Sequence, residues 1–271
     1  MSDLFAPAHL DRSKILTEKK GDTFVITLNR PEKRNALDGN LMFGIKTAIE
    51  DVFTSTSIRA IIIRGEGAGF SAGVDFLALA GTGLMTEGGV HVRRLIREMQ
   101  DIVNLIDDIE KPVIFAVHGF CFGMATELIL SGDFRIAQRG TKFGIQETAV
   151  GLIPDVGGTT RMTRLLGPIK AKELIMTAKT IDADEAKTIQ LVNDVVDDAF
   201  AGALEFADTL NKNAPLAVGL AKKLINRAQH MDARSFMELE AIAQSTLIHT
   251  EDVKEGIAAK IEKREPKFTG K

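Results

Sequence analysis

The sequence predicts a mixed α/β protein with a helical C-terminal region, and two patterns along the chain carry this prediction. Short β-branched apolar runs alternate with segments of helical periodicity from residue 23 to residue 137. After residue 171 such runs almost vanish, and the remaining segments have helical spacing. Alternating strands and helices favour parallel strand pairing, because a crossover helix returns the chain to the same end of the sheet.

The strands and helices of the first half follow from this periodicity. Residues 23–28 (TFVITL) alternate and are β-branched, which predicts a strand, and residues 29–36 form a turn. Apolar runs predict further strands at residues 58–64, 112–117 and 134–137. Apolar residues at helical spacing predict helices at residues 40–53, 90–109 and 122–131.

The second half is expected to be helical, at residues 171–178, 201–211, 215–228 and 233–249. The chain of 271 residues is long enough for one large domain with an appendage. We therefore expect a core at residues 1–200 and a helical region at residues 201–271.

Composition limits the classes of partner. The formal net charge of −3 provides no basic field for nucleic acid or an anionic membrane. The locally basic segment HVRRLIR (residues 91–97) is interpreted as a solvated helix face rather than an RNA site. No apolar run approaches the ~20 residues of a membrane span. The first residues carry Asp3 and lack an apolar signal-peptide core, so a cytoplasmic location is predicted.

Several sequence signatures of cofactors and nucleophiles are absent. Phe70 stands where a dinucleotide-binding loop needs its third glycine, and the chain has no P-loop and no serine-hydrolase elbow. The five histidines are far apart, so neither a metal site nor a bound cofactor is expected. The single cysteine, Cys121, is expected to be a small buried hydrophobe rather than a catalytic thiol.

Two glycine-containing turns are candidates for an oxyanion hole. The first is FSAGVD (residues 70–75), and the second is HGFCFGMATE (residues 118–127), which runs from a buried strand into a helix. A helix start leaves N–H groups without acceptors, at the positive end of the helix dipole. Two converging donors would stabilise a carbonyl oxygen as it becomes negative. Either turn alone is also consistent with a purely structural glycine turn.

Three acids are candidates for proton transfer. Glu127 is the only charge between Gly119 and Ser131, and a carboxyl in such an apolar segment is either paired or raised in pKa. The alternatives are therefore general acid/base work and a structural salt bridge, for example to Arg135. Glu147 is either a second such group or an exposed carboxylate at a strand end. Asp155, in PDVGG, is favoured as a turn former.

Together these segments resemble the crotonase (enoyl-CoA hydratase/isomerase) superfamily over nearly the whole chain. The resemblance is carried by five segments: LNRPEKRNAL (28–37), GFSAGVDF (69–76), KPVIFAVHGFCFGMATELILSGDFRIA (111–137), KFGIQETAVGLIPDVGGTTRMTRLLG (142–167) and the C-terminal EDVKEGIAAKIEKREPKFTGK. It implies a crotonase-like spiral of β-β-α units with a helical C-terminal region that forms homotrimers, often paired into hexamers. It also implies an acyl-CoA thioester substrate, no cofactor besides that substrate, and a role in fatty acid β-oxidation.

The resemblance also assigns residues. The oxyanion donors fall on the backbone N–H groups of Val74 and Met124, where hydratases usually have glycine at the second position. The two hydratase carboxylates fall on Glu127 and Glu147. Contacts to coenzyme A and substrate are expected from the family's two CoA-contacting segments, at Arg34, Ala36, Val74, Asp75, Phe76, Leu77 and Met124. A solvated surface arginine is an equal alternative for Arg34.

The reaction implied is hydration of a trans-2-enoyl-CoA, and Asp155 is a departure from the hydratase pattern. An acid at this position resembles dienoyl-CoA isomerases and 3-hydroxyisobutyryl-CoA hydrolases. The nearest alternative is therefore isomerisation of a 3,5-dienoyl-CoA to the 2,4-dienoyl-CoA by Glu147 and Asp155. Hydrolysis of an acyl-CoA thioester comes third, and a non-catalytic RNA-binding relative is disfavoured.

Overall fold

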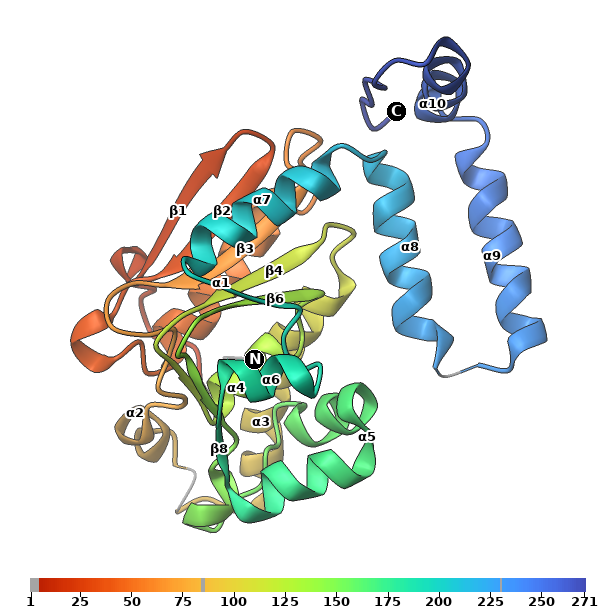
Figure 1. Ribbon diagram of the computed structural model, residues 1–271. Helices are drawn as coiled ribbons and strands as arrows, with labels where there is room; N and C mark the ends of the chain where they lie inside the picture. The colour runs from red at the N-terminus through yellow and green to blue at the C-terminus, as the bar shows by residue number, and fades with distance from the viewer. Residues whose placement is uncertain (1–4, 84–85, 230) are drawn as a thin grey trace.

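A six-stranded sheet forms the centre of the molecule in the computed structural model, which describes residues 5–83, 86–229 and 231–271 (Figure 1). Its strands lie in the order β1 (Ile15–Lys20), β2 (Thr23–Leu28), β3 (Ala60–Gly65), β4 (Val113–Val117), β6 (Phe134–Gln138) and β9 (Asp194–Val196). The predicted parallel pairing is confirmed from β2 to β9. The edge strand β1 is antiparallel to β2, and its polar, mostly exposed residues explain why no strand was predicted there.

Both faces of this sheet are covered, and alternate residues of one strand point to opposite faces. Ile61 and Ile63 of β3 belong to the core shared with α1 (Gly39–Val52) and α3 (Gly89–Asp108). Ile62 belongs to a second core that includes α7 (Ala199–Asn211). A strand that is buried on both faces has a continuous run of apolar residues, and this run made it possible to predict β3 from the sequence.

A second, small sheet holds the segments that matter for function. It pairs β5 (Phe120–Phe122) with β7 (Lys142–Gly144), and β7 with β8 (Thr180–Asp182). The predicted helix at residues 122–131 is wrong at its start, because β5 takes up residue 122 and α4 spans only Met124–Ile129. Strands β8 and β9 also contradict the expectation that strands nearly vanish after residue 171. The four short strands β5, β7, β8 and β9 have three residues each, which is too few to show periodicity in a sequence.

Further helices connect and cover these sheets: α2 (Phe76–Gly81), α5 (Gly158–Thr177) and α6 (Ala183–Thr188). Three 3₁₀ turns complete this part: η1 (Arg12–Lys14), η2 (Pro31–Lys33) and η3 (Glu147–Val150). Helix α5 bends at Gly167, which has a φ of 76° and is followed by Pro168. The helix predicted at residues 171–178 is the last part of α5.

The last three helices extend away from the central sheet (Figure 1). They are α8 (Pro215–Ala228), α9 (Ala233–Leu247) and α10 (Glu251–Glu262), which confirms the predicted C-terminal helices. Helix α9 has no buried residue among those described. Helix α7, although it lies almost entirely beyond residue 200, packs on the sheet.

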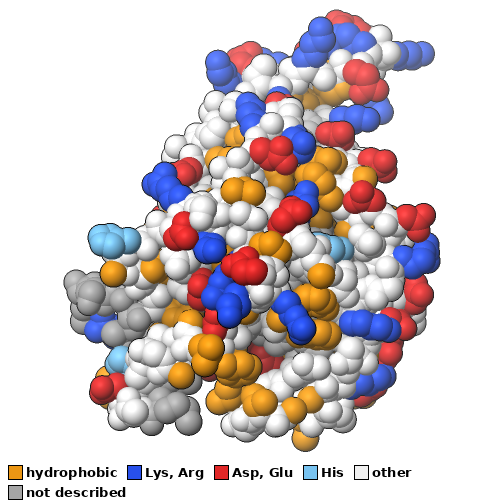
Figure 2. All heavy atoms as spheres, turned by 90° about the vertical axis from the view of Figure 1, so that its left-hand side faces the viewer, with side chains coloured by type: hydrophobic (Ala, Val, Ile, Leu, Met, Phe, Trp, Pro, Cys, Tyr) orange, Lys and Arg blue, Asp and Glu red, His pale blue; other side chains and the backbone are white. Residues whose placement is uncertain are grey.

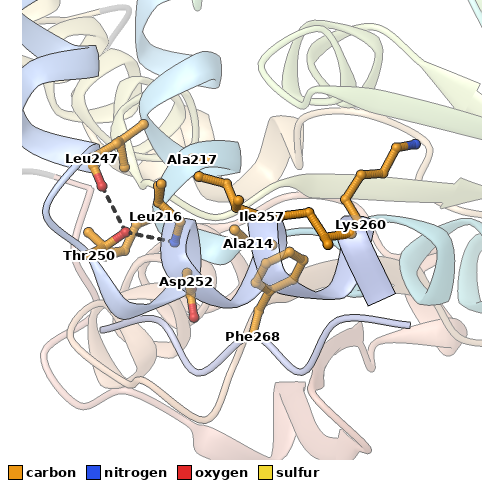
Figure 3. Close-up of a pocket in the computed structure, with 12 residues that line it drawn as sticks. Ala214, Leu216, Ala217, Leu247, Thr250, Asp252, Ile257, Lys260 and Phe268 are labelled. Carbon is orange, nitrogen blue, oxygen red and sulfur yellow. Dashed lines mark hydrogen bonds between the residues drawn. The ribbon is translucent and has the colours of Figure 1, made fainter. Parts of the chain in front are cut away.

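An apolar groove lies between α8, α10 and the C-terminal segment (Figure 3). Leu216, Ile257 and Phe268 line it. The Thr250 hydroxyl donates to the Leu247 carbonyl at 2.8 Å and accepts the Val253 N–H at 3.3 Å, which begins α10. Within the described ranges, no helix has the length and apolar character needed to cross a membrane.

Candidate active site

The two glycine-containing turns lie side by side. Ser71 and Cys121 form a parallel bridge, in which the Ser71 N–H donates to the Phe120 carbonyl at 3.2 Å and the Phe122 N–H donates to the Ser71 carbonyl at 3.1 Å. The bridge pairs position 71 with position 121. Further along, a Cβ on Gly73 would lie 3.5 Å from the Met124 nitrogen, so the segment that contains Val74 lies next to Met124.

The N–H groups of Val74 and Met124 have no hydrogen-bond acceptor in the part of the chain that the structure describes. On the far side of the first turn, Leu37 donates to the Gly73 carbonyl at 2.7 Å and accepts from Asp75 at 2.9 Å. Successive N–H groups of an extended segment alternate in direction, so the Val74 N–H points away from Leu37, toward the second turn. Met124 is the first residue of α4, where an N–H has no partner within the helix.

Gly73 allows the two turns to approach each other. Its φ is 93°, and a Cβ there would lie 2.7 Å from the Phe122 carbonyl oxygen and 3.5 Å from the Met124 nitrogen. Only glycine fits this conformation and this space. The two predicted oxyanion donors are thus brought together by backbone packing.

Asn35 holds the first turn in place and was missed by the sequence analysis. It is fully buried, and its Nδ2 donates to the carbonyls of Glu66 at 2.8 Å, Gly69 at 3.1 Å and Phe70 at 3.1 Å. Its own carbonyl accepts the Ser71 hydroxyl at 2.7 Å. Asn35 has a φ of 50°, which asparagine tolerates better than most residues, and this preference was the available signal.

Glu127 is buried in α4 and is bound by backbone amides. Its side chain is 1% exposed, and Oε2 accepts N–H groups from Val156 and Gly158, each at 2.8 Å. The salt bridge to Arg135 does not form: that guanidinium donates to the carbonyls of Leu191 at 2.7 Å and Gly132 at 2.8 Å. Glu127 is therefore a buried carboxyl without a cationic partner among the described residues.

Glu147 lies against the second turn, next to Gly123. It is the first residue of η3, and a Cβ on Gly123 would lie 3.1 Å from its Oε1. Its Oε2 is buried and has no hydrogen-bond partner among the described residues. An exposed strand-end carboxylate, the alternative for Glu147, is therefore excluded.

The pKa values of three neighbouring acids are raised. Burial is the main cause for Glu127, and it outweighs the Gly158 and Val156 N–H groups; with Glu147 and Asp155 nearby, the pKa rises to about 8. Burial also raises the pKa of Glu147, to which Asp155 adds. The pKa of Asp155 is raised by burial. The structure thus brings together all three candidate acids.

The expected coenzyme A residues lie around the first turn. Arg34 is exposed, and its carbonyl accepts the Ala72 N–H at 3.0 Å, which joins its turn to the oxyanion segment. The Ala36 carbonyl accepts from Arg30 at 3.0 Å. The Asp75 carboxylate is occupied: Oδ2 accepts from Arg30 at 2.7 Å, and Oδ1 accepts the first N–H groups of α2.

Phe76 and Leu77 extend from α2 into solvent. They are 56% and 83% exposed. Figure 2 shows hydrophobic side chains gathered on the lower part of the face on which α2 lies in Figure 1. Cationic and anionic side chains are interspersed over that face, without a wide basic patch.

Two other predictions concern the cysteine thiol and a metal site. Cys121 is a free thiol that is fully buried, and burial raises its pKa far above the usual range, so the prediction of a buried hydrophobe is confirmed. Over the described ranges, no three side chains of His, Cys, Asp or Glu are grouped as metal ligands would be.

This fold and this pair of turns define a family. The chain matches the family model described as enoyl-CoA hydratase/isomerase over residues 18–271, and it belongs to that family. It is 36% identical over 261 residues to the short-chain-enoyl-CoA hydratase of Clostridium acetobutylicum, covering 94% of this chain and 97% of that protein. It is 37% identical over 260 residues to the crotonyl-CoA hydratase of Syntrophomonas wolfei, covering 95% and 98%.

Solved structures agree with this assignment. An enoyl-CoA hydratase from Bacillus anthracis superposes with a TM-score of 0.89 at 34% identity, over 95% of this chain and 100% of that chain. A structure from Streptomyces coelicolor, described as a putative enoyl-CoA hydratase, gives a TM-score of 0.90 at 30% identity, over 98% of each chain. The predicted crotonase-like fold is therefore confirmed.

Proposed function

We propose that this protein is an enoyl-CoA hydratase, a hydro-lyase that adds water across the 2,3 double bond of a trans-2-enoyl-CoA thioester. The observation that carries the proposal is a pair of glutamates, the buried Glu127 and the half-buried Glu147, beside two unpaired backbone N–H groups. Hydration needs a group that takes a proton from water, a group that gives a proton to carbon, and donors for an enolate oxygen. The names of the two curated relatives support the same reaction.

The thioester carbonyl binds between the N–H groups of Val74 and Met124. As the oxygen of water attacks Cβ, the electrons of the double bond move toward the carbonyl, and negative charge develops on its oxygen. Removing one such donor costs about 3–4 kcal/mol in enzymes where this has been measured. Because both donors belong to the backbone, the methionine at position 124 keeps the chemistry available to the glycine usual in hydratases.

The two glutamates share one proton in this mechanism. Two coupled carboxyls in a buried site do not ionise independently, so the pair retains a proton near neutral pH. Glu127 Oε2 has two amide donors, which stabilise a carboxylate, whereas Glu147 Oε2 has none. We therefore assign the base to Glu127 and the acid to Glu147.

The proton balance closes over one turnover. Glu127 takes a proton from water as the C–O bond forms at Cβ, and Glu147 gives its proton to Cα as the enolate collapses. The product is the 3-hydroxyacyl-CoA. Glu127 is then protonated and Glu147 ionised, and proton exchange between the two restores the starting state.

Coenzyme A binding is assigned to the turn of Arg34 and Ala36 and to residues 74–77. Arg34, which is exposed, is proposed to meet a phosphate, and Asp75 is proposed to fix the turn through Arg30 rather than to touch the ligand. The exposed Phe76 and Leu77 offer apolar surface to the acyl or pantetheine part.

The decisive experiment is an assay of crotonyl-CoA, whose ultraviolet absorbance falls when the conjugated double bond is hydrated. Glu127→Gln and Glu147→Gln should each lower kcat by at least about 100-fold, the usual contribution of general acid/base groups, with little change in KM. Near-normal hydration by both variants would sink the assignment.

Isomerisation of a 3,5-dienoyl-CoA is a second candidate because of one observation. Asp155 is close enough to Glu147 to raise its pKa, so these two acids form an alternative proton-shuttling pair. Incubation with a 3,5-dienoyl-CoA, which gains absorbance on conversion to the 2,4-isomer, separates the two reactions. Hydrolysis, the third alternative, would release free thiol.

We also propose a homotrimer, paired as a dimer of trimers, as the working assembly. Helix α9 has no buried residue among those described, and Met237 and Ile242 on it are 64% and 62% exposed. Unpartnered apolar surface of this kind is typical of subunit contacts. Light scattering on the purified protein tests the assembly. A cytoplasmic location and a role in β-oxidation belong to the same proposal.

A further inference from the structure

A line of hydrogen bonds connects α3 to the turn that binds Glu127. Gln100 Nε2 donates to the Asp155 carbonyl at 2.7 Å. Arg161, in the first turn of α5, donates to Asn104 Oδ1 at 2.9 Å and to Asp107 Oδ2 at 3.1 Å. Positions 100, 104 and 107 lie on one face of a helix, so α3 meets the segment from residue 155 to residue 161 along its length.

The contact of Gln100 differs from the others because it acts on a peptide group that also holds Glu127. The Asp155 carbonyl and the Val156 N–H belong to the same peptide unit. That unit is planar and trans, so its C=O and N–H point in opposite directions. Gln100 donates to the oxygen on one side, and on the other side the N–H donates to Glu127 Oε2 at 2.8 Å.

Two physical consequences follow from this arrangement. The side-chain amide of Gln100 restrains the tilt of the peptide plane, which fixes the direction of the Val156 N–H. A hydrogen bond accepted by a peptide carbonyl also polarises the N–H of the same unit and makes it a stronger donor. Both effects favour the ionised form of Glu127 over the protonated form.

The other charged groups near Glu127 act differently. Glu147 on η3 and Asp155 in the turn both disfavour its ionisation. The Arg161 guanidinium is directed to Asn104 and Asp107 on α3 and makes only a long contact, 3.5 Å, with the Val156 carbonyl. The two backbone N–H groups are thus the groups that favour the Glu127 carboxylate.

We propose that Gln100 is a positioning residue, which orients and polarises the Asp155–Val156 peptide group and thereby keeps the shared proton on Glu147 rather than on Glu127. The inference rests on the proposed hydratase function. Gln100 acts without touching the substrate, so its effect falls on kcat and on the pH dependence and leaves KM unchanged.

The test is Gln100→Met, which keeps the length of the side chain and removes the donor, assayed with crotonyl-CoA from pH 5 to pH 10. We expect kcat to fall several-fold to about tenfold, the effect of one hydrogen bond. The acidic limb of the kcat profile should move to higher pH, because a weaker Val156 donor raises the pKa of Glu127, which has to be ionised to act as the base. Arg97→Met, on an exposed position of the same helix, is the matched control and should match the wild type.

A purely structural role for Gln100 gives a different result. It would lower the melting temperature and leave kcat and the acidic limb of folded enzyme where they are in the wild type, and that outcome overturns the inference. Absence of hydration by the wild type would instead overturn the proposed function, and the inference with it.

A second variant decides the matter if Gln100→Met does not fold. In Gln100→Glu, the protonated carboxyl donates to the Asp155 carbonyl, whereas the ionised carboxylate repels it. The activity of this variant relative to the wild type should therefore decline as pH rises from about 4 to about 7, the range in which a glutamate side chain ionises. A constant ratio over that range would contradict the proposal.

Discussion

Gly158 leaves the space that the Glu127 side chain occupies. A Cβ on Gly158 would lie 2.6 Å from Cγ and 2.8 Å from Oε2 of Glu127, distances that real atoms do not adopt. The Gly158 N–H donates to the same Oε2, so a single residue both admits the carboxylate and binds it. The start of α5 is thus shaped around the proposed base.

Gly158→Ala should impair catalysis by displacing Glu127. The added methyl group has no room, and it also meets Pro154 at 2.8 Å, so either the carboxylate or the turn must move. A displacement of about 1 Å at a catalytic group costs on the order of 100-fold in rate. We expect a loss of that size in kcat for crotonyl-CoA. Gly81→Ala, where a Cβ meets nothing within 4 Å, is the control and should keep wild-type kcat.

The pH dependence of hydration should follow the glutamate pair. The productive state has one proton on the pair, so activity falls when the last proton leaves and also when both groups are protonated. Because burial raises the pKa values of both Glu127 and Glu147, the pair holds its last proton into the alkaline range, and kcat should decline when that proton leaves. A rate that stays constant from pH 7 to pH 10 would show that the pair does not control the reaction.

Asp155→Asn should move the same alkaline limb to lower pH. The Asp155 carboxylate raises the pKa of Glu127 and of Glu147, and a neutral amide removes this repulsion while keeping the shape of the side chain. For a hydratase the maximal rate should change little, whereas an isomerase that uses Asp155 would lose most of its activity. Profiles of kcat for both enzymes, measured with both classes of thioester, separate these outcomes.

The sequence predicted the parts of this protein that repeat a local pattern. β3 was evident as an apolar run, and Glu127 was evident as a lone charge in an apolar helix. What the sequence did not contain is the identity of the atoms around Glu127. The two N–H groups that bind it come from residues 29 and 31 positions further along the chain, and no periodicity links them.

The same limit explains the other omissions. Gln100 is one polar residue among many on an amphipathic helix, and its contact with Asp155 depends on how α3 packs. In the sequence, Asn35 is an ordinary turn residue. Its role depends on contact with the turn at residues 66–71, which forms only in the folded protein. Tertiary packing assigns these roles, so a single sequence shows the acids but leaves out the residues that hold them.

Glu127→Gln should stabilise the folded protein at alkaline pH even though it removes activity. In the folded state the pKa of Glu127 is raised from about 4.5 to about 8, so the unfolded chain loses this proton at a lower pH than the native protein does. The wild type therefore loses stability as pH rises through this interval, and the loss is complete above pH 8. A glutamine stays neutral, and its oxygen can still accept the N–H groups of Val156 and Gly158.

The measurement is the melting temperature of both proteins at pH 5 and at pH 9. The variant should exceed the wild type clearly at pH 9 and differ little at pH 5, because Glu127 is protonated in the native wild type there. Glu205→Gln, on an exposed position of α7, is the control and should show no such trend. If the difference in melting temperature between Glu127→Gln and the wild type were the same at both pH values, Glu127 would not carry a raised pKa. The proposal of a proton-sharing pair would then lose its basis.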